Sequence, residues 1–237
     1  IQDWDRGLVV GRRTFGKGLV QRPMGLSDGS EIRLTIARYF TPTGRFIQKP
    51  YDDVESYRKD ISERYLNGEF VSADSIKMPD SLKFKTLVKN RTVFGGGGIM
   101  PDFFVPLDTT GTSDYFSELI RGGFLNTFSY EYTNNNRKKL LNKYPDFSDF
   151  NTSFDCDEPF MDSFFKYVEE QDSTLKYSEE DFNESGEFIK LRLKAFLARN
   201  LWDTSEFYQV YNSTNEILVR AIDILKSEEY NKIDLDN

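Results

Sequence analysis

Residues 7–21 read GLVVGRRTFGKGLVQ, and they decide how the first part of the chain is interpreted. The short apolar run within residues 7–11 is bounded by glycines, which is typical of a buried strand. Residues 18–24 form a second strand candidate. Between the two strands Lys17 has a glycine on each side, which sets this basic side chain apart from the neighbouring Arg12 and Arg13.

Further strand and helix signals follow in the same region. Residues 26–30, LSDGS, contain an Asp-Gly pair that favours a tight turn. Residues 31–40 alternate apolar and polar side chains, which predicts a half-buried strand that pairs back as a hairpin. Apolar residues at helical spacing predict a helix over residues 52–66, and residues 83–93 are a weaker strand candidate. We interpret glycines 95–98 as positions that need close backbone approach and positive φ.

Composition changes near residue 110. Fifteen of the 16 glycines lie in residues 1–123, and that part carries a formal charge of +2, whereas residues 124–237 carry −10. The sequence therefore predicts an α+β protein with two domains, an α/β region over residues 1–110 and an acidic, all-helical domain over residues 111–237. Capping residues and apolar spacing predict helices over about residues 113–120, 158–170, 178–202 and 203–226.

The composition also excludes several kinds of site. The 237 residues contain no histidine and a single cysteine, Cys156. A Ser-His-Asp triad, a His-ligated zinc site and an internal disulfide are therefore excluded within this chain. The formal net charge of −8 argues against a nucleic-acid partner and against an anionic membrane surface. No apolar run reaches the roughly 18 residues of a membrane span.

Lys17 has three interpretations. The stretch approaches the phosphate-binding pattern G-x-x-x-x-G-K-[ST], but position 18 is glycine and a strand follows instead of a helix, which argues against a nucleotide site. A surface lysine in a glycine turn is the ordinary interpretation. In a chain without histidine, a lysine enclosed between glycines is also a candidate general base, because burial disfavours the ammonium form.

Gln21 follows Lys17 by four residues, so the two side chains lie on the same side of a strand or of a helix. In an extended strand their Cα atoms would be about 13 Å apart. A direct contact would then need curvature or a bulge, and the sequence leaves this open.

Three blocks of the first region carry a family resemblance: residues 7–21, residues 26–48 and the FGGGGIMPD element at residues 94–102. Together they resemble the carboxyl-terminal processing, or tail-specific, peptidases, which are serine peptidases with a Ser/Lys catalytic pair. The resemblance covers about residues 1–107 in family order. It implies that the α/β region is the C-terminal part of a peptidase core, a mixed sheet with helices in a crotonase-like spiral.

The resemblance also implies site residues. Lys17 matches the general base, and Gln21 matches the residue that orients this lysine in some members. Asp3 matches an acidic position proposed as catalytic in others, although an ordinary helix-end aspartate fits it equally well. In the family the nucleophilic serine precedes the lysine by some two dozen residues, which is more than the number of residues that precede Lys17 in this sequence. We therefore expect that serine, the oxyanion-hole residues and the PDZ domain to be absent here, and the fragment alone to be inactive.

By the same resemblance the parent is a bacterial endopeptidase of the periplasm or cell envelope. It would cut polypeptides with unstructured C-termini near those termini, and it would need neither a metal nor a nucleotide cofactor. The competing hypothesis is a non-catalytic protein-binding or scaffold module, in which the helical domain recruits a partner. The sequence does not indicate the oligomeric state.

Overall fold

The computed structural model describes residues 1–108, 110–111, 113–230 and 233. The chain is a mixed α+β protein that folds into two compact units. The first unit consists of Ile1–Asp108 together with the C-terminal helix α8 (Glu216–Lys226). The second unit contains helices α2 to α7.

Helix α8 differs from the sequence-based division, which placed residues 111–237 in one helical domain. Its first residue, Glu216, forms a 3.0 Å ion pair with Arg12 of the first unit. Farther along α8, the Arg220 guanidinium lies 5.8 Å from the centroid of the Phe103 ring. Helical spacing identifies a helix but does not identify the surface against which it packs, which is why the sequence grouped α8 with its neighbours.

The described strands of the first unit form three two-stranded sheets. These are a parallel pair of β1 (Val10–Gly11) with β6 (Phe103–Phe104), an antiparallel pair of β2 (Leu19–Gly25) with β3 (Glu31–Arg38), and an antiparallel pair of β4 (Lys83–Lys85) with β5 (Thr92–Phe94). Helix α1 (Val54–Leu66) confirms the predicted helix. The single strand candidate at residues 83–93 is in fact the two short strands β4 and β5.

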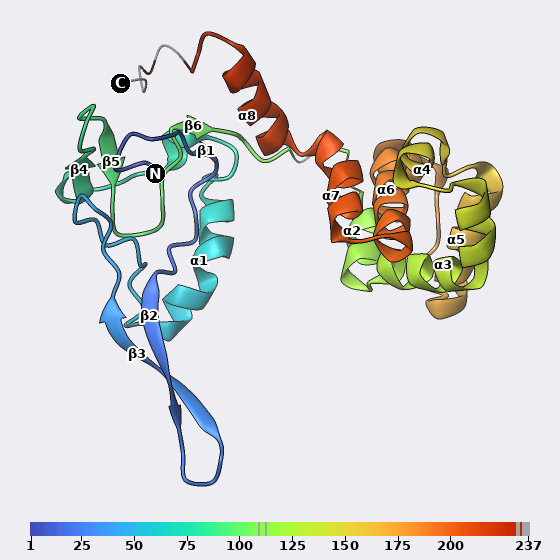
Figure 1. The fold of residues 1–237 in the computed structure, drawn as a ribbon, viewed down its shortest axis with the longest axis horizontal. Helices are drawn as coiled ribbons and strands as arrows, with labels where there is room; N and C mark the ends of the chain where they lie inside the picture. The colour runs from blue at the N-terminus through green and yellow to red at the C-terminus, as the bar shows by residue number, and fades with distance from the viewer. Residues whose placement is uncertain (109, 112, 231–232, 234–237) are drawn as a thin grey trace. The chain divides into compact units, whose positions relative to one another are not determined.

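The β2–β3 hairpin confirms the predicted pairing but not the predicted burial. Figure 1 shows it extending away from the rest of the first unit. Every residue of β3 is exposed, including Ile32, Leu34 and Ile36, whose exposed fractions are 40%, 45% and 57%. The alternating pattern correctly marks one apolar face, but no layer among the described residues covers it.

The interior of the first unit is mostly polar. Its buried polar and charged residues are Gln2, Asp3, Asp5, Arg45, Gln48, Arg64 and Thr86, whereas its buried hydrophobic residues are Val93, Val105 and Ile224. Buried polar groups are tolerated only when they are paired. Hydrogen bonds and ion pairs therefore hold much of this unit together, and they fix the loops described below.

The second unit is a helical bundle around an aromatic core. Its helices are α2 (Asp114–Arg121), α3 (Phe124–Lys143), α4 (Phe147–Ser153), α5 (Glu158–Gln171), α6 (Glu179–Leu201) and α7 (Thr204–Tyr211). Helix α6 contacts α2, α3, α4 and α7, and its Ile189, Leu193 and Leu197 are completely buried. The helices predicted from residues 113, 158 and 178 are confirmed.

Two details of the helical unit bear on the sequence-based expectations. The side chains of Ser113 and Ser178 accept hydrogen bonds from backbone N–H groups in the first turns of α2 and α6, as the capping patterns predict. The helix expected over residues 203–226 is interrupted, because a 3₁₀ turn, Asn212–Thr214, separates α7 from α8. Within the described parts of the chain, no helix has both the length and the apolar character of a membrane span.

Candidate functional site

The candidate site is the Lys17 loop, defined here as residues 12–18, which connects β1 to β2. Gly16 has φ +89°, and a Cβ at this position would lie 2.6 Å from the backbone nitrogen of Gly98 and 2.9 Å from the backbone oxygen of Ile47. Only glycine permits such a close approach with this backbone conformation. The sequence feature that singled out Lys17 therefore has a steric cause on its N-terminal side.

Hydrogen bonds fix the backbone on both sides of Lys17. The backbone N–H of Lys49 donates to the carbonyl oxygen of Gly16 at 2.7 Å. The backbone N–H of Gly18 donates to the Gln48 side-chain oxygen at 2.8 Å. Gln48 is only 1% exposed. Sequence reasoning missed Gln48, because a glutamine in an irregular segment has no periodicity, and its presence in the second family block is the only signal that includes it.

The glycine run at residues 95–98 lies against the Lys17 loop. Gly96, Gly97 and Gly98 have φ values of +74°, +158° and +94°. A Cβ at Gly98 would lie only 2.0 Å from the backbone oxygen of Thr14. Thr14 also donates its backbone N–H to the Ile99 oxygen and accepts the Ile99 N–H at its side-chain hydroxyl. The predicted roles of this run, close approach and positive φ, are confirmed.

The Lys17 side chain itself is exposed. This differs from the expected enclosure: Gly16 is buried against Gly98, whereas the next residue, Lys17, is exposed. Among the described residues, no hydrogen bond or ion pair involves the Lys17 ammonium group. The loop thus presents an amine without a carboxylate partner, on a backbone that is held firmly.

Gln21 lies on β2, where it is exposed and faces Thr35 across the hairpin. The strand register shifts between Val20 and Gln21. Because Val20 pairs with Ala37 and Gln21 pairs with Thr35, the extra residue is Ile36 on β3, and β2 carries no extra residue there. In the part of the chain that is described, no hydrogen bond joins the two side chains.

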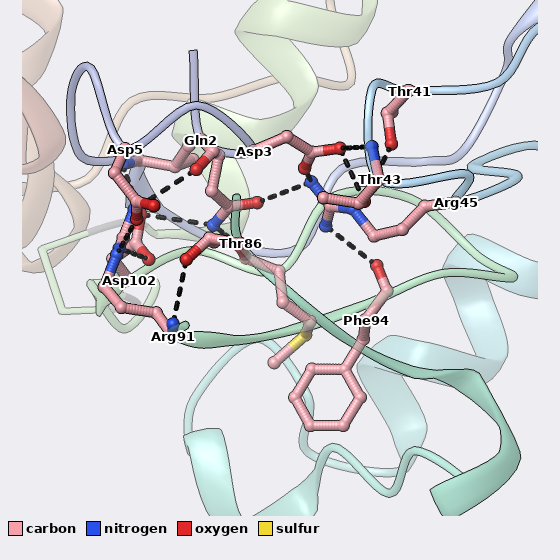
Figure 2. Close-up of polar contacts among 12 residues, drawn as sticks. Gln2, Asp3, Asp5, Thr41, Thr43, Arg45, Thr86, Arg91, Phe94 and Asp102 are labelled. Atoms are coloured by element: carbon pink, nitrogen blue, oxygen red, sulfur yellow. Dashed lines mark hydrogen bonds and ion pairs between the residues drawn. The ribbon is translucent and has the colours of Figure 1, made fainter. Parts of the chain in front are cut away.

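Asp3 is buried in a polar cluster, which Figure 2 shows in detail. Its carboxylate forms an ion pair with Arg45 and accepts hydrogen bonds from the backbone N–H of Thr43 at 3.0 Å and from the Thr43 hydroxyl at 2.7 Å. Burial opposes ionisation, but the hydrogen bonds from Thr41, Thr43 and Arg45 outweigh it and lower the pKa of Asp3 to about 2. This carboxylate is therefore ionised at neutral pH, with both oxygens occupied.

The cluster continues from Asp3 to the chain segments before and after the glycine run. The Gln2 side chain accepts a hydrogen bond from Arg45 at 3.1 Å and donates to Asp102 at 3.1 Å. Arg91 bridges Asp5 and Asp102 through ion pairs of 2.7 and 2.5 Å (Figure 2). These contacts fasten the N-terminal turn to the strands and loops around residue 91.

One short segment links the Asp3 cluster with the Lys17 loop. Thr43 and Arg45, which contact Asp3, are followed by Gln48 and Lys49, which hold the backbone around Lys17. The fold therefore brings Asp3 and the Lys17 loop to the two ends of the same segment. Among the described residues, the side chains of Asp3 and Lys17 do not contact each other.

Comparison with known proteins identifies the segment that carries this geometry. Residues 1–56 match the sequence model of Peptidase family S41. These residues are similar to peptidase family S41, and we call them the S41 segment. The S41 segment contains Asp3, Lys17 and Gln21 as well as the whole β2–β3 hairpin.

Curated relatives resemble the S41 segment closely but over a short length. A chloroplastic C-terminal processing peptidase from Tetradesmus obliquus is 55% identical over 49 residues, which are 21% of this chain and 11% of that protein. A carboxyl-terminal-processing protease from Synechocystis sp. is 49% identical over 49 residues, 21% of this chain and 12% of the relative. The carboxy-terminal processing protease CtpB from Bacillus subtilis is 49% identical over 41 residues, 17% and 8% respectively. The chain thus spans about a tenth of the length of these relatives.

The comparisons indicate no activity for the helical unit. Residues 115–203 match a family of unknown function, DUF8443. No solved structure matches the chain. The S41 segment therefore connects this chain to proteins of named activity.

Proposed function

We propose that this chain is part of a serine endopeptidase that cuts polypeptides near their C-termini and uses Lys17 as its general base. The observation that carries the proposal is the position of Lys17 within the S41 segment, on a loop fixed from both sides. Its ammonium group has no carboxylate partner among the described residues.

In the proposed reaction a serine from another part of the protein attacks the scissile carbonyl. The neutral Lys17 amine takes the hydroxyl proton and passes it to the leaving amine, which departs as the acyl-enzyme forms. Water then attacks the ester while Lys17 accepts its proton, and Lys17 returns that proton to the serine oxygen as the acyl group leaves as a carboxylic acid. The part of the protein that bears the serine, together with bound substrate, would cover the exposed lysine and favour its neutral form.

Two further residues support Lys17 in this proposal. Gln21 orients the lysine, and its spacing of four residues, which places both side chains on the same side of the backbone, supports this assignment. Asp3 has a positioning part, because a carboxylate with two occupied oxygens and a pKa of about 2 does not accept a proton near neutral pH. It holds the segment that leads to Gln48.

The wider assignments rest on the same segment. We assign the first unit to a peptidase core of the crotonase-like type, and substrates with unstructured C-termini to the active site. The protein would act in the bacterial periplasm or cell envelope. The relatives include both bacterial and chloroplastic processing enzymes, which supports a site of action of this general kind.

The test uses the complete protein and a fluorogenic polypeptide with an unstructured C-terminal tail. Lys17→Ala should lower the cleavage rate by about 10³-fold or more while circular dichroism stays unchanged. Lys77→Ala, another exposed lysine of the first unit, is the matched control and should cleave at the normal rate. Normal cleavage by Lys17→Ala would refute the assignment and would favour the competing role, recruitment of a protein partner by the helical unit.

A further inference from the structure

Arg64, in the last turn of α1, is a buried charge that the proposed reaction does not use. It is 3% exposed, and its Nε forms a 2.9 Å ion pair with Asp60. Burying a guanidinium group is costly unless its N–H groups find partners. The partners that Arg64 finds show what its charge does.

The two terminal nitrogens of Arg64 reach out of the helix into the Lys17 loop. Nη1 donates to the backbone oxygen of Thr14 at 3.0 Å, and Nη2 donates to that of Phe15 at 3.3 Å. Nη2 also donates to the backbone oxygen of Gly97 at 3.4 Å. An arginine near the end of a helix commonly binds the last carbonyls of that helix. Here it binds carbonyls that lie 33 to 50 residues away in sequence.

A second arginine strengthens the same junction. Arg13 donates to the backbone oxygen of Gly97 at 3.1 Å and to the Glu69 carboxylate at 2.5 and 3.2 Å. Glu69 also lies 4.0 Å from the Nε of Arg64. The two guanidinium groups therefore converge on Gly97, and the two acids Asp60 and Glu69 compensate their charge.

Two of the three carbonyls that Arg64 binds, those of Phe15 and Thr14, lie two and three residues before Lys17. The next carbonyl, that of Gly16, is held by Lys49, and the amide that follows Lys17 is held by Gln48. With Arg64 in place the backbone is fixed from Thr14 to Gly18. Without it, the stretch would retain the contacts of Thr14 with Ile99 and its later contacts, but the carbonyls of Thr14 and Phe15 would lose their guanidinium donor.

We propose that Arg64 is a positioning residue for Lys17: it clamps the Lys17 loop to the glycine run and thereby holds the base in its working place. The proposal rests on the proposed function of Lys17. Arg64 lies beyond residues 1–56, which match family S41, so α1 supplies this support from outside the matched segment.

The contacts of Arg64 require an arginine side chain at this position. Arginine presents several donors in a planar fork and serves three carbonyls at once, which the single ammonium group of lysine does not reproduce. A misplacement of about 1 Å of a catalytic group costs on the order of 10²-fold in rate. The loss should fall on the chemical step, because Arg64 is buried and does not line the exposed side of Lys17.

The test compares Arg64→Gln and Arg64→Lys with Arg58→Gln in the complete protein. Arg58 lies on the same helix and is exposed, so it is the matched control. With the fluorogenic polypeptide, kcat should fall about 10–100-fold for Arg64→Gln and less for Arg64→Lys, with KM within twofold of normal. Arg58→Gln should leave both constants unchanged.

A second measurement separates this proposal from the proposed function. Amide hydrogen exchange of residues 14–18 should become faster in both Arg64 variants and not in Arg58→Gln, whether or not the protein is a peptidase. If Lys17→Ala cleaves normally, the proposed function fails, and the exchange data alone decide whether Arg64 holds the loop.

Several outcomes would overturn the positioning role. They are normal kcat in both Arg64 variants of a protein in which Lys17→Ala is inactive, a rise in KM with unchanged kcat, and unchanged exchange of residues 14–18. Loss of the circular dichroism spectrum in Arg64→Lys as well as Arg64→Gln would also overturn it, because Arg64 would then be required for folding in place of positioning.

Discussion

Replacement of Asp3 by asparagine tests whether the buried polar cluster holds the first unit together. The change keeps the size of the side chain and removes the negative charge that faces Arg45. Arg45 is 1% exposed, and among the described residues it would retain only neutral acceptors, namely the asparagine oxygen, Gln2 and the backbone oxygen of Phe94. Removing one partner of a buried ion pair leaves the other charge uncompensated, which typically costs about 3–5 kcal/mol.

The pKa of Asp3 shows how this loss depends on pH. The native contacts lower it from 3.8 to about 2, and one pKa unit corresponds to about 1.4 kcal/mol, so roughly 2 kcal/mol of stability depends on the ionised carboxylate. Because the pKa is lower in the folded protein, this stabilisation is complete above about pH 4 and disappears as the pH falls toward 2. The difference between wild type and Asp3→Asn should therefore be largest near neutral pH and shrink by about 2 kcal/mol at pH 2.

Urea unfolding followed by tryptophan fluorescence measures this difference. The chain has two tryptophans, Trp4 in the first unit and Trp202 in the second, so a Trp202→Phe background makes Trp4 the reporter of the first unit. Glu55→Gln, in an exposed ion pair of α1, is the control and should leave the unfolding midpoint unchanged. A loss below about 1 kcal/mol for Asp3→Asn, or a loss that does not change between pH 7 and pH 2, would refute the reasoning.

Three other predictions concern single positions. Gly98→Ala should destabilise the first unit by about 2 kcal/mol or more, because the new Cβ would clash with the backbone oxygen of Thr14 in the Lys17 loop. Gly29→Ala, in an open turn, is the control and should cost only about 1 kcal/mol. Equal urea midpoints for the two variants would contradict this prediction. Phe164→Ala should cost the second unit about 3–5 kcal/mol in urea unfolding and exposed Tyr130→Ala much less, and a small loss at Phe164 would contradict its place in the core. Burial raises the pKa of the Cys156 thiol to about 12. At pH 8 a thiol reagent should therefore label the folded chain at least about 100-fold more slowly than the chain unfolded in urea. Equal labelling rates would show that Cys156 is accessible in the folded chain.

The sequence predicts elements best where local chemistry determines them. The Asp-Gly turn of the hairpin, the serine caps of α2 and α6, and the glycine run are each dictated by a few neighbouring residues, and each is confirmed. Helix α3 (Phe124–Lys143) was not identified individually, because its middle is a run of threonine and asparagine with weak helical preference. Its buried residues, among them Leu125 and Phe128, supply the stability that propensity lacks.

The candidate site shows the same division between local and distant effects. The glycines around Lys17 and the family blocks identify the loop from sequence, but its supports are spread over the first unit. Gln48 and Arg64 are a buried glutamine and a buried arginine, residue types that usually occur at the surface, and nothing in their own neighbourhoods marks them as interior. Their role depends on contacts 30 to 50 residues apart in sequence.

The S41 match ends at residue 56, yet the geometry of the matched segment depends on residues that follow it. Arg64 and Gly98 fix the entry to the Lys17 loop, Arg91 fastens the N-terminal turn, and α8 returns to β1 through Glu216. A catalytic lysine must be held to within a fraction of an ångström, and a loop cannot do so through its own contacts. The matched segment that carries the proposed base and the framework that holds its loop are therefore distinct parts of the sequence. Substitutions in that framework should change kcat without touching any residue of the family motif.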